Sequence, residues 1–410
     1  MDDSEGVIKA DMAAADRGEA LSAMEPLGLM EGSRHRPALT DLAVELAARS
    51  AGFRRSLPPG VLSALADLVR AMNCYYSNLI EGHNTHPVDI ERAMKGDYSA
   101  DLAKRNLQLE ARAHVAVQRW IDAGGVKGRA VSPDAIREIH RRFCEDLPAD
   151  LLLVRDEATR REVVVVPGAW RRDDVQVGRH VAISAGAVPR FVERFGCFYG
   201  GLGRTETILC AAAAHHRLLW IHPFADGNGR VARLMSHASL LEVLDTGGVW
   251  SIARGLARNS AAYKQHLMAC DQVRRNDLDG RGNLSEEALA AFTTFFLETC
   301  LDQVTFMEDL VQPDRLRNRT LLWAEEEVRA GALPARAGQV LEAVLYRGEL
   351  PRADVPELLG HGDRQARRVV SALMERGVLQ AASTRAPLRL AFPATLAGRW
   401  MPGLFPEQTA

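Results

Sequence analysis

The segment His222–Arg230 gathers residues that are well suited to chemistry on a phosphate group. It reads HPFADGNGR and lies between two apolar stretches, AAAAHHRLLWI before it and VARLMSHASLLEVL after it, which both predict helices. Backbone N–H groups at the start of a helix lack helical acceptors and lie at the positive end of the helix dipole. The pattern therefore predicts a loop that leads into a helix N-terminus and binds an anion there.

The side chains of this loop add groups that bind phosphate. Gly227 and Gly229 have no Cβ, so the backbone can approach a ligand closely. The Arg230 guanidinium can contact phosphate oxygens and neutralise charge that develops during a transfer, and the Asn228 amide can donate to the same oxygens. Together these residues predict a cradle for a phosphate-bearing ligand.

Two further residues predict a reaction in this cradle. Asp226 offers a carboxylate of the kind that holds Mg²⁺ beside phosphate oxygens. The imidazole of His222, a side chain whose usual pKa is near neutrality, can take the proton of a hydroxyl nucleophile. We expect the Phe224 ring to point into the core and to anchor the loop.

These residues resemble the signature of the Fic family, HPFx(D/E)GNGRxxR, and the sequence matches every specified position, including Arg233. The resemblance implies Mg²⁺ as cofactor, ATP as donor, and transfer of AMP to a Tyr, Thr or Ser hydroxyl of a target protein. By this likeness His222 is the base and Asp226 is the Mg²⁺ ligand. The residues assigned to the nucleotide are Phe224, Asp226, Gly227, Asn228, Gly229, Arg230, Arg233 and Tyr263.

A stretch before the motif resembles the flap of the same family. Glu162–Val166 is a β-branched run, Pro167 and Gly168 form a turn signal, and Val175–Val177 is the predicted returning strand of a small hairpin. In the family, the flap holds the target segment by strand-like pairing over the active site. The target-docking residues that the resemblance implies are Val165, Gly168, Trp170 and Arg171.

The stretch Ser251–Ala253, with Asn259 and Tyr263, resembles the family's residues near the adenine, although Lys264 replaces a second tyrosine that is frequent there. The likeness covers roughly residues 40–310. Relatives that transfer UMP or phosphocholine carry variants of the signature, so these donors are the alternatives to ATP. The intact GNGR favours a nucleotide donor that delivers AMP.

Ser77 and Glu81 lie four residues apart on one face of a predicted helix, and Gly82 is a helix stop signal. Alone, this pattern is typical of a solvated glutamate at a helix end. Beside the signature, it resembles the inhibitory helix of Fic proteins, (S/T)xxxE(G/N), whose glutamate pairs with the second signature arginine, here Arg233. The resemblance implies low basal activity and strong self-modification in Glu81→Gly, and in some relatives the same glutamate supports removal of AMP.

The order of predicted elements indicates an all-α fold: a Fic helical core with a small β-hairpin flap, an N-terminal helical inhibitory region and a C-terminal winged helix-turn-helix domain. The length of 410 residues also predicts more than one domain. The expected organisation is a flexible leader at 1–35, the N-terminal helical region at 36–125, the catalytic core at 126–312, a connecting helix at 313–335 and a winged-helix-like domain at 336–400.

The C-terminal domain supports a rival function, that of a DNA-binding regulator. Predicted helices at 338–346, 352–359 and 364–376 precede two short strands at 377–379 and 388–390, which is the order of a winged helix-turn-helix. Arginines around the third helix could contact DNA phosphates, although many winged helices bind proteins instead. These arginines are Arg352, Arg364, Arg367, Arg368, Arg376, Arg385 and Arg389.

The overall composition limits the kinds of partner and the cellular location that we expect for the protein. The 51 Lys and Arg residues nearly balance the 53 Asp and Glu residues, so no global field attracts nucleic acid or a membrane. Six scattered cysteines without a CxxC pair are typical of reduced thiols. Because the acidic N-terminus lacks a signal-peptide pattern and no apolar run approaches about 20 residues, we expect a soluble, cytoplasmic protein.

A metal hydrolase that uses His215, His216, His222 and Asp226 is a further rival. It is disfavoured because adjacent helical histidines point about 100° apart and no HExxH pair is present. The candidate partners are ATP, a target protein that could be the chain itself, DNA, and a second copy of the chain in a homodimer. We expect no membrane partner.

Overall fold

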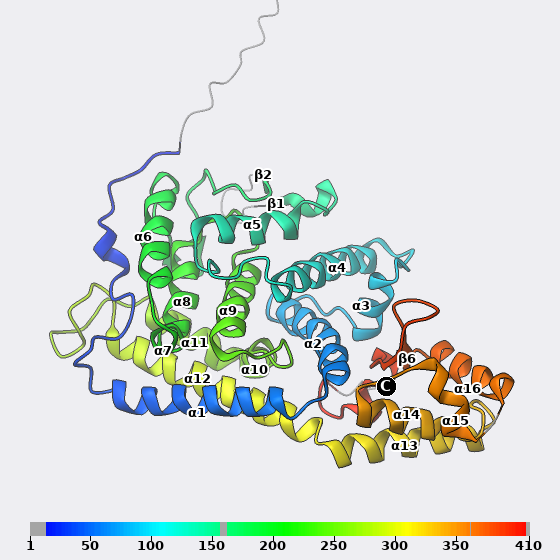
Figure 1. Cartoon of the computed structure of the whole chain (residues 1–410). Coiled ribbons are helices and arrows are strands. Elements are labelled where there is room, and N and C mark those ends of the chain that lie inside the picture. Colours follow the sequence, from blue (N-terminus) through cyan, green and yellow to red (C-terminus); the bar gives the residue numbers. More distant parts are fainter. Residues whose placement is uncertain (1–13, 156–161, 361, 407–410) are drawn as a thin grey trace, which may run out of the picture. The chain divides into compact units, whose positions relative to one another are not determined.

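The computed structural model describes residues 14–155, 162–360 and 362–406. These residues form helices and three small antiparallel sheets of two or three strands, which confirms the predicted all-α class (Figure 1). The chain divides into two compact units that do not follow the predicted domain boundaries, because each collects segments from distant parts of the sequence. The first unit is Met1–Arg36, Arg129–Ser236 and Lys264–Thr293, and the second is Pro37–Gly128, His237–Tyr263 and Thr294–Ala410.

The first unit is built on helices around an apolar centre. Its α5 starts as predicted, because the Ser132 hydroxyl accepts the Ala135 N–H at 3.2 Å and Pro133 occupies the first turn. Phe191 and Phe195 are fully buried on α6, and the Phe224 ring is fully buried in the loop between α8 and α9. The helices are α5 (Pro133–Cys144), α6 (Val188–Gly200), α7 (Arg204–Leu209), α8 (Ala211–Ile221) and the N-terminal part of α9 (Asn228–Leu244).

The N-terminal segment lies on the first unit. The buried Arg217 guanidinium donates to the Pro26 carbonyl at 2.9 and 3.1 Å, and the Tyr199 hydroxyl donates to the Leu27 carbonyl at 2.6 Å. Leu284 donates its N–H to the Glu25 carbonyl at 2.8 Å. Residues 14–35 of the predicted flexible leader are therefore fixed by hydrogen bonds, and residues 1–13 lie outside the described residues.

The predicted hairpin between Glu162–Val166 and Val175–Val177 is wrong. Strand β2 (Glu162–Val164) pairs instead with β1 (Leu153–Arg155), and β3 (Gln176–Val177) pairs with β4 (His180–Val181). The physical reason is the segment between the two β-rich stretches, in which Gly168 turns the chain at φ 74° and Arg171 is buried. The buried Arg171 separates the β1–β2 pair from the β3–β4 pair, so each strand pairs with the strand nearest to it in sequence.

The second unit centres on α2 (Pro59–Ile80). This helix is buried on several faces, with Leu65, Val69, Met72 and Tyr76 each nearly inaccessible. Its further helices are α1 (Arg36–Arg55), α3 (Pro87–Met94), α4 (Leu102–Asp122), α10 (Ala253–Arg258), α13 (Pro313–Arg329) and α17 (Ala397–Trp400), while α11 (Ser260–Cys270) begins in this unit and α12 (Glu286–Leu310) ends in it.

The C-terminal module, residues 337–390, belongs to the second unit. A three-stranded antiparallel sheet in the order β5-β7-β6 accompanies its helices, and β6 pairs with β7 as expected from the sequence. The buried apolar face of α16 includes Ala366, Val369 and Leu373. The elements are α14 (Ala337–Arg347), β5 (Glu349–Leu350), α15 (Val355–Leu359), α16 (Asp363–Glu375), β6 (Leu379–Gln380) and β7 (Leu388–Leu390).

None of the described helices is both long and apolar enough to cross a membrane.

Candidate active site

His222 ends α8 in a left-handed conformation, with φ 50° and ψ 62°, while its N–H still donates to the Leu218 carbonyl at 3.1 Å. A non-glycine residue in this region costs about 1–2 kcal/mol, so the surrounding contacts must hold it there. The sharp turn directs Pro223 and Phe224 into the core, where both are buried. The loop therefore runs from α8 to the N-terminus of α9, as the sequence predicted.

The His222 imidazole is mostly buried, and burial lowers its pKa to about 4, with the positive charge of Arg171 acting in the same direction. At neutral pH the ring is therefore uncharged. A neutral imidazole is the form that can accept a proton from a hydroxyl group, which suits the role expected of this residue.

Arg171 fixes the backbone around His222. Its Nε donates to the His222 carbonyl at 2.7 Å and one terminal nitrogen donates to the Ile183 carbonyl at 2.5 Å. The Arg171 N–H donates to the Pro223 carbonyl at 2.9 Å. Burial lowers the pKa of Arg171 to about 10. The expectation that this side chain docks a target is therefore wrong, because it is buried and satisfies carbonyls at the end of α8.

Asn228 also acts inside the loop. Its Oδ1 accepts the Phe224 N–H and its Nδ2 donates to the Phe224 carbonyl, both at 2.9 Å. The Asn228 side chain is buried and its amide thus links the two ends of the loop, so we correct the expectation that it donates to phosphate oxygens. Gly227, between them, has φ 80°, which explains the need for glycine at this position.

His140 supports the loop and was not singled out from the sequence. Its ring stacks on Phe224 with centroids 3.9 Å apart, and its Nδ1 accepts the Gly168 N–H at 2.9 Å. Burial lowers its pKa to about 4, so the ring is neutral. The available signal was a histidine on the same helical face as Ile136 and Phe143, because a polar residue on an apolar face needs an internal partner.

Asp226 and Arg230 remain at the mouth of the loop. The Asp226 side chain is 48% exposed, and an Arg230 terminal nitrogen lies 3.5 Å from its carboxylate. The guanidinium of Arg230 also lies 4.8 Å from the Phe143 ring centroid. Arg233 is buried one turn further along α9, and Gly229 lies in the first turn of this helix. The N-terminal end of α9, where backbone N–H groups lack acceptors within the helix, therefore lies near a carboxylate and two arginines, a combination that suits an anion.

Magnesium fits Asp226, whose carboxylate is accessible and adjoins the helix N-terminus. Within the described residues there is no group of three His, Cys, Asp or Glu residues arranged to hold a metal ion. A hard cation at Asp226 would then complete its shell with phosphate oxygens and water, as Mg²⁺ commonly does.

The predicted flap residues divide into buried and accessible ones. Val165 is buried and its N–H donates to the Leu152 carbonyl at 2.7 Å, so this side chain cannot receive a target. Val164 and Val166 beside it are 63% and 56% exposed. Trp170 lies against the Phe224 ring, with centroids 5.1 Å apart. An open cavity of about 490 Å³ adjoins Gly168 and is lined by Arg129, Asp134, Arg137, Glu138, Arg141, Pro167 and Gly168.

Four predicted site residues belong to the second unit. Tyr263 is buried in the first turn of α11, and Ser77 is buried in α2. Glu81 is exposed at the C-cap of α2, and Gly82 follows with φ 88°. The His83 N–H donates to Asn78 and the Gly82 N–H to Leu79, which confirms the predicted helix stop as a Schellman motif. The pairing of Glu81 with Arg233 stays a prediction.

The histidines of the rival metal site have separate partners. His215 Nδ1 lies 2.9 Å from the Ser236 hydroxyl, and His216 Nε2 lies 2.9 Å from the Asp271 carboxylate. Burial lowers the pKa of both rings, to about 3 and about 4. Both side chains are satisfied inside the core, which agrees with the argument against a metal hydrolase.

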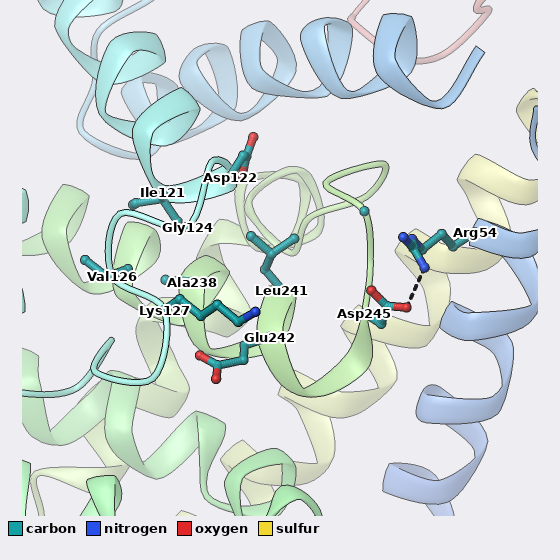
Figure 2. Close-up of a pocket in the computed structure, with 11 residues that line it drawn as sticks. Arg54, Ile121, Asp122, Gly124, Val126, Lys127, Ala238, Leu241, Glu242 and Asp245 are labelled. Carbon is teal, nitrogen blue, oxygen red and sulfur yellow. Dashed lines mark hydrogen bonds and ion pairs between the residues drawn. The ribbon is translucent and has the colours of Figure 1, made fainter. Parts of the chain in front are cut away.

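A pocket of about 340 Å³ in the second unit contains none of the predicted site residues (Figure 2). Three of its charged lining residues have partners: Arg54 pairs with Asp245 at 2.5 Å, and Asp122 pairs with Arg70 at 2.6 Å and with His237 at 2.7 Å. The lining residues are Arg54, Ile121, Asp122, Gly124, Val126, Lys127, Ala238, Leu241, Glu242, Asp245 and Gly247.

The fold and the loop define a helical protein whose candidate site is a histidine-containing loop at a helix N-terminus. Residues 130–240 match the model of the Fic/DOC family. The chain is 30% identical over 194 residues to Protein adenylyltransferase Fic of Nematostella vectensis, covering 45% of this chain and 41% of that protein. It is 35% identical over 173 residues to Protein adenylyltransferase Fic of Culex quinquefasciatus, covering 41% and 31%.

A solved Fic family protein from Desulfovibrio desulfuricans G20 aligns over 85% of this chain and 96% of its own, with 17% identity and a TM-score of 0.49. The matches to the two curated relatives span less than half of their length. The family model and the named relatives thus place the likeness to the Fic/DOC family in the part of the chain that carries the candidate site, residues 130–240.

Proposed function

We propose that this chain transfers AMP from ATP to a Ser, Thr or Tyr hydroxyl of a target protein. The observation that carries the proposal is the neutral His222, which is fixed by Arg171 at a loop that feeds the N-terminus of α9. The two relatives named protein adenylyltransferase Fic support the same reaction class.

In the proposed reaction, His222 takes the proton of the target hydroxyl, and the hydroxyl oxygen forms a bond to the α-phosphorus of ATP. The bond from that phosphorus to the β-phosphate oxygen breaks, and pyrophosphate leaves with the electron pair. The backbone N–H groups of α9, with Arg230 and Arg233, would stabilise the negative charge on the phosphates. Magnesium at Asp226 would neutralise phosphate charge when bound.

Target docking is proposed at the two β-ribbons of the first unit. The exposed residues Val164, Val166, Val177 and Val181 give these ribbons an apolar, accessible surface. A two-stranded ribbon has outer edges that can accept an added strand, so an extended target segment with apolar side chains is the expected partner. UMP and phosphocholine donors are the alternatives to ATP, and self-modification is the first activity to look for.

We further propose that Glu81 inhibits this reaction by pairing with Arg233. A carboxylate on that guanidinium would occupy the position of a phosphate and cancel the charge needed there. The stable C-terminal end of α2 supports this proposal, because its Schellman motif presents Glu81 at a defined position.

The test is the intact mass of purified Glu81→Gly protein after incubation with ATP and Mg²⁺. We expect the mass of one or more AMP groups to be added, and no addition when His222→Ala is combined with Glu81→Gly. Glu375→Gly, at another exposed helix end, serves as the matched control and should stay unmodified like the wild type.

The remaining outcomes discriminate between the alternatives. Addition of UMP or phosphocholine but not AMP would show that the chain uses a donor other than ATP. No addition with any of these donors would contradict the transferase. If the modified Glu81→Gly protein loses AMP on mixing with wild-type chain and Mg²⁺, the chain also removes AMP.

A further inference from the structure

The outer face of α16 carries arginines that lack a counter-charge. Arg364, Arg367 and Arg368 are exposed and lie within about one turn of each other. Arg385, between β6 and β7, is also exposed. Within residues 14–155, 162–360 and 362–406, these four guanidinium groups have no hydrogen-bond or ion-pair partner.

Other exposed arginines of this region are paired. Arg376 pairs with Glu327, Arg399 pairs with Glu326, and Arg389 pairs with Glu349 at 3.0 Å. Arg352 donates to the Ala386 carbonyl at 3.3 Å. The seven arginines considered from the sequence therefore separate into three that have a partner in the protein and four that face solvent without one.

The arginine face of α16 is held toward solvent by the packing of the opposite face. The opposite face of the helix is packed through Ala366, Val369, Val370 and Leu373. The helix before it, α15, ends at Leu359, where Gly360 adopts φ 62°, and α16 begins at Asp363. The β6–β7 pair follows α16 and places Arg385 between its two strands.

We infer that this face binds duplex DNA, with α16 in the major groove and Arg385 at a neighbouring phosphate. The major groove, about 12 Å wide, admits one α-helix, and a second helix of a helix-turn-helix presents its exposed side chains there. Three unpaired cations within one turn match the dense phosphate charge of DNA better than the mixed surface of a protein. The site is independent of the proposed transferase.

The experiment measures fluorescence anisotropy of a labelled duplex of mixed sequence, about 30 base pairs long, with the full chain at about 50 mM salt. We expect the triple variant Arg364→Ala, Arg367→Ala, Arg368→Ala to bind at least about tenfold more weakly and to lower the salt slope by about 3. The matched control removes the same charge from paired positions, Arg317→Ala, Arg329→Ala and Arg399→Ala, and should bind like the wild type.

Two outcomes would overturn the inference. Failure of the wild-type chain to bind duplex DNA even at low salt would leave the face to a protein partner. Equal weakening in the α16 triple and in the control triple would show that only the overall charge matters. Circular dichroism of both triples, unchanged from the wild type, ensures that a loss of binding reports the surface.

A second observation concerns regulation of the proposed transferase. The C-terminal strap, residues 401–406, holds the helix that carries Ser77 and Glu81. The buried Tyr76 hydroxyl donates to the Leu404 carbonyl at 2.9 Å, and the Tyr75 ring packs edge-on against Phe405 with centroids 5.6 Å apart. Both tyrosines directly precede Ser77 in α2.

Two further contacts extend this support. Arg254 donates to the Gly403 carbonyl at 2.9 Å and lies over the Phe306 ring at 3.5 Å, which fixes the strap in the second unit. At the other end of α2, a Cβ on Gly60 would lie 1.9 Å from the Gly348 carbonyl oxygen of the C-terminal module. We propose that the strap and the module keep α2 in its inhibitory position, and that loosening them raises AMP transfer.

This second proposal depends on the proposed function, so its test includes Glu81→Gly as a reference. We expect Tyr76→Phe and Phe405→Ala to raise basal AMP addition by about 2- to 10-fold, the factor that one buried hydrogen bond is worth in a two-state equilibrium. Tyr346→Phe, at an exposed position of α14, is the matched control. Hydrogen exchange in residues 75–80 should accelerate in the first two variants only.

The outcomes separate the two proposals. If Glu81→Gly adds AMP and the strap variants stay at the wild-type rate, the strap proposal is overturned and the transferase stands. If Glu81→Gly adds no group from any donor, both are overturned. In a Glu81→Gly background, Tyr76→Phe should have no additional effect on AMP addition, because the inhibition that it weakens is already absent.

Discussion

Arginine has two different uses in the candidate loop and in the C-terminal module. Arg171 is buried and donates to the carbonyls of His222 and Ile183, so its hydrogen bonds are completed by the protein itself. Arg364 and Arg367 on α16 are exposed and have no partner among the described residues. The comparison teaches that a buried arginine determines the shape of a site, whereas an unpaired exposed one is available to a ligand.

The loop is fixed before any ligand arrives. The contacts of Asn228 with Phe224 and of His140 with both Phe224 and Gly168 use neutral groups that are satisfied internally. Such preorganisation costs no rearrangement during a reaction. The face of α16 is prearranged by its buried side, and its function depends on what binds it.

Among single substitutions, the largest effect is expected for Arg171→Ala. Removing the guanidinium leaves the His222 and Ile183 carbonyls without their donor in a buried place, which should lower the free energy of unfolding by about 3–5 kcal/mol. Urea unfolding followed by circular dichroism measures this. A loss no larger than that of Arg367→Ala would break the comparison between the two regions.

Acid should weaken the first unit next. Burial lowers the pKa of His140, His216 and His222 to about 4 and that of His215 to about 3, from an ordinary value of 6.5. The unfolded chain therefore binds protons more readily between pH 6.5 and about 4. With respect to these histidines, the free energy of unfolding is highest above pH 6.5. It decreases as the pH falls below 6.5, by up to about 1.4 kcal/mol per pH unit for each histidine.

Urea titrations at pH 7.5, 6.5 and 5.5 measure this dependence. A free energy of unfolding that stays constant across the three values would contradict the buried, neutral state of the histidines. Replacing His140 by Gln should reduce the slope between pH 6.5 and 5.5, because one of the titrating groups is removed.

Gly227→Ala tests the loop backbone alone. A Cβ at this position would lie 3.5 Å from the nearest His140 carbon, an ordinary contact, so the cost comes from φ 80° and should be about 1–2 kcal/mol. Thermal unfolding compares this variant with Gly178→Ala, in which φ is 61° and no atom is near. A similar loss in both would show that only the backbone conformation matters, and a much larger loss at Gly227 would show that His140 resists the new Cβ.

The smallest effect on stability is expected for the arginine face of α16. Arg364→Ala, Arg367→Ala and Arg368→Ala should each change the free energy of unfolding by no more than about 0.5 kcal/mol, because they break no internal contact. The same substitutions should weaken DNA binding. A loss of several kcal/mol in urea unfolding would mean that these side chains stabilise the module.

The sequence by itself determined the helical class, the loop between α8 and α9, the start of α5 at Ser132 and the end of α2 at Gly82. These features depend on local signals, such as apolar periodicity, caps and a glycine with positive φ, which act over a few residues. A contiguous motif could therefore be recognised without knowledge of the fold.

Only the tertiary structure decided how Arg171, Asn228 and His140 are used. Each of them can donate or accept toward a ligand or toward the protein, and the choice depends on which backbone groups the folded chain brings beside them. The pairing of Glu162–Val164 was likewise decided by tertiary structure, because strand propensity does not specify a partner. Long-range packing selects among partners that the sequence leaves equivalent, since a buried polar group must find its hydrogen bonds wherever the fold supplies them.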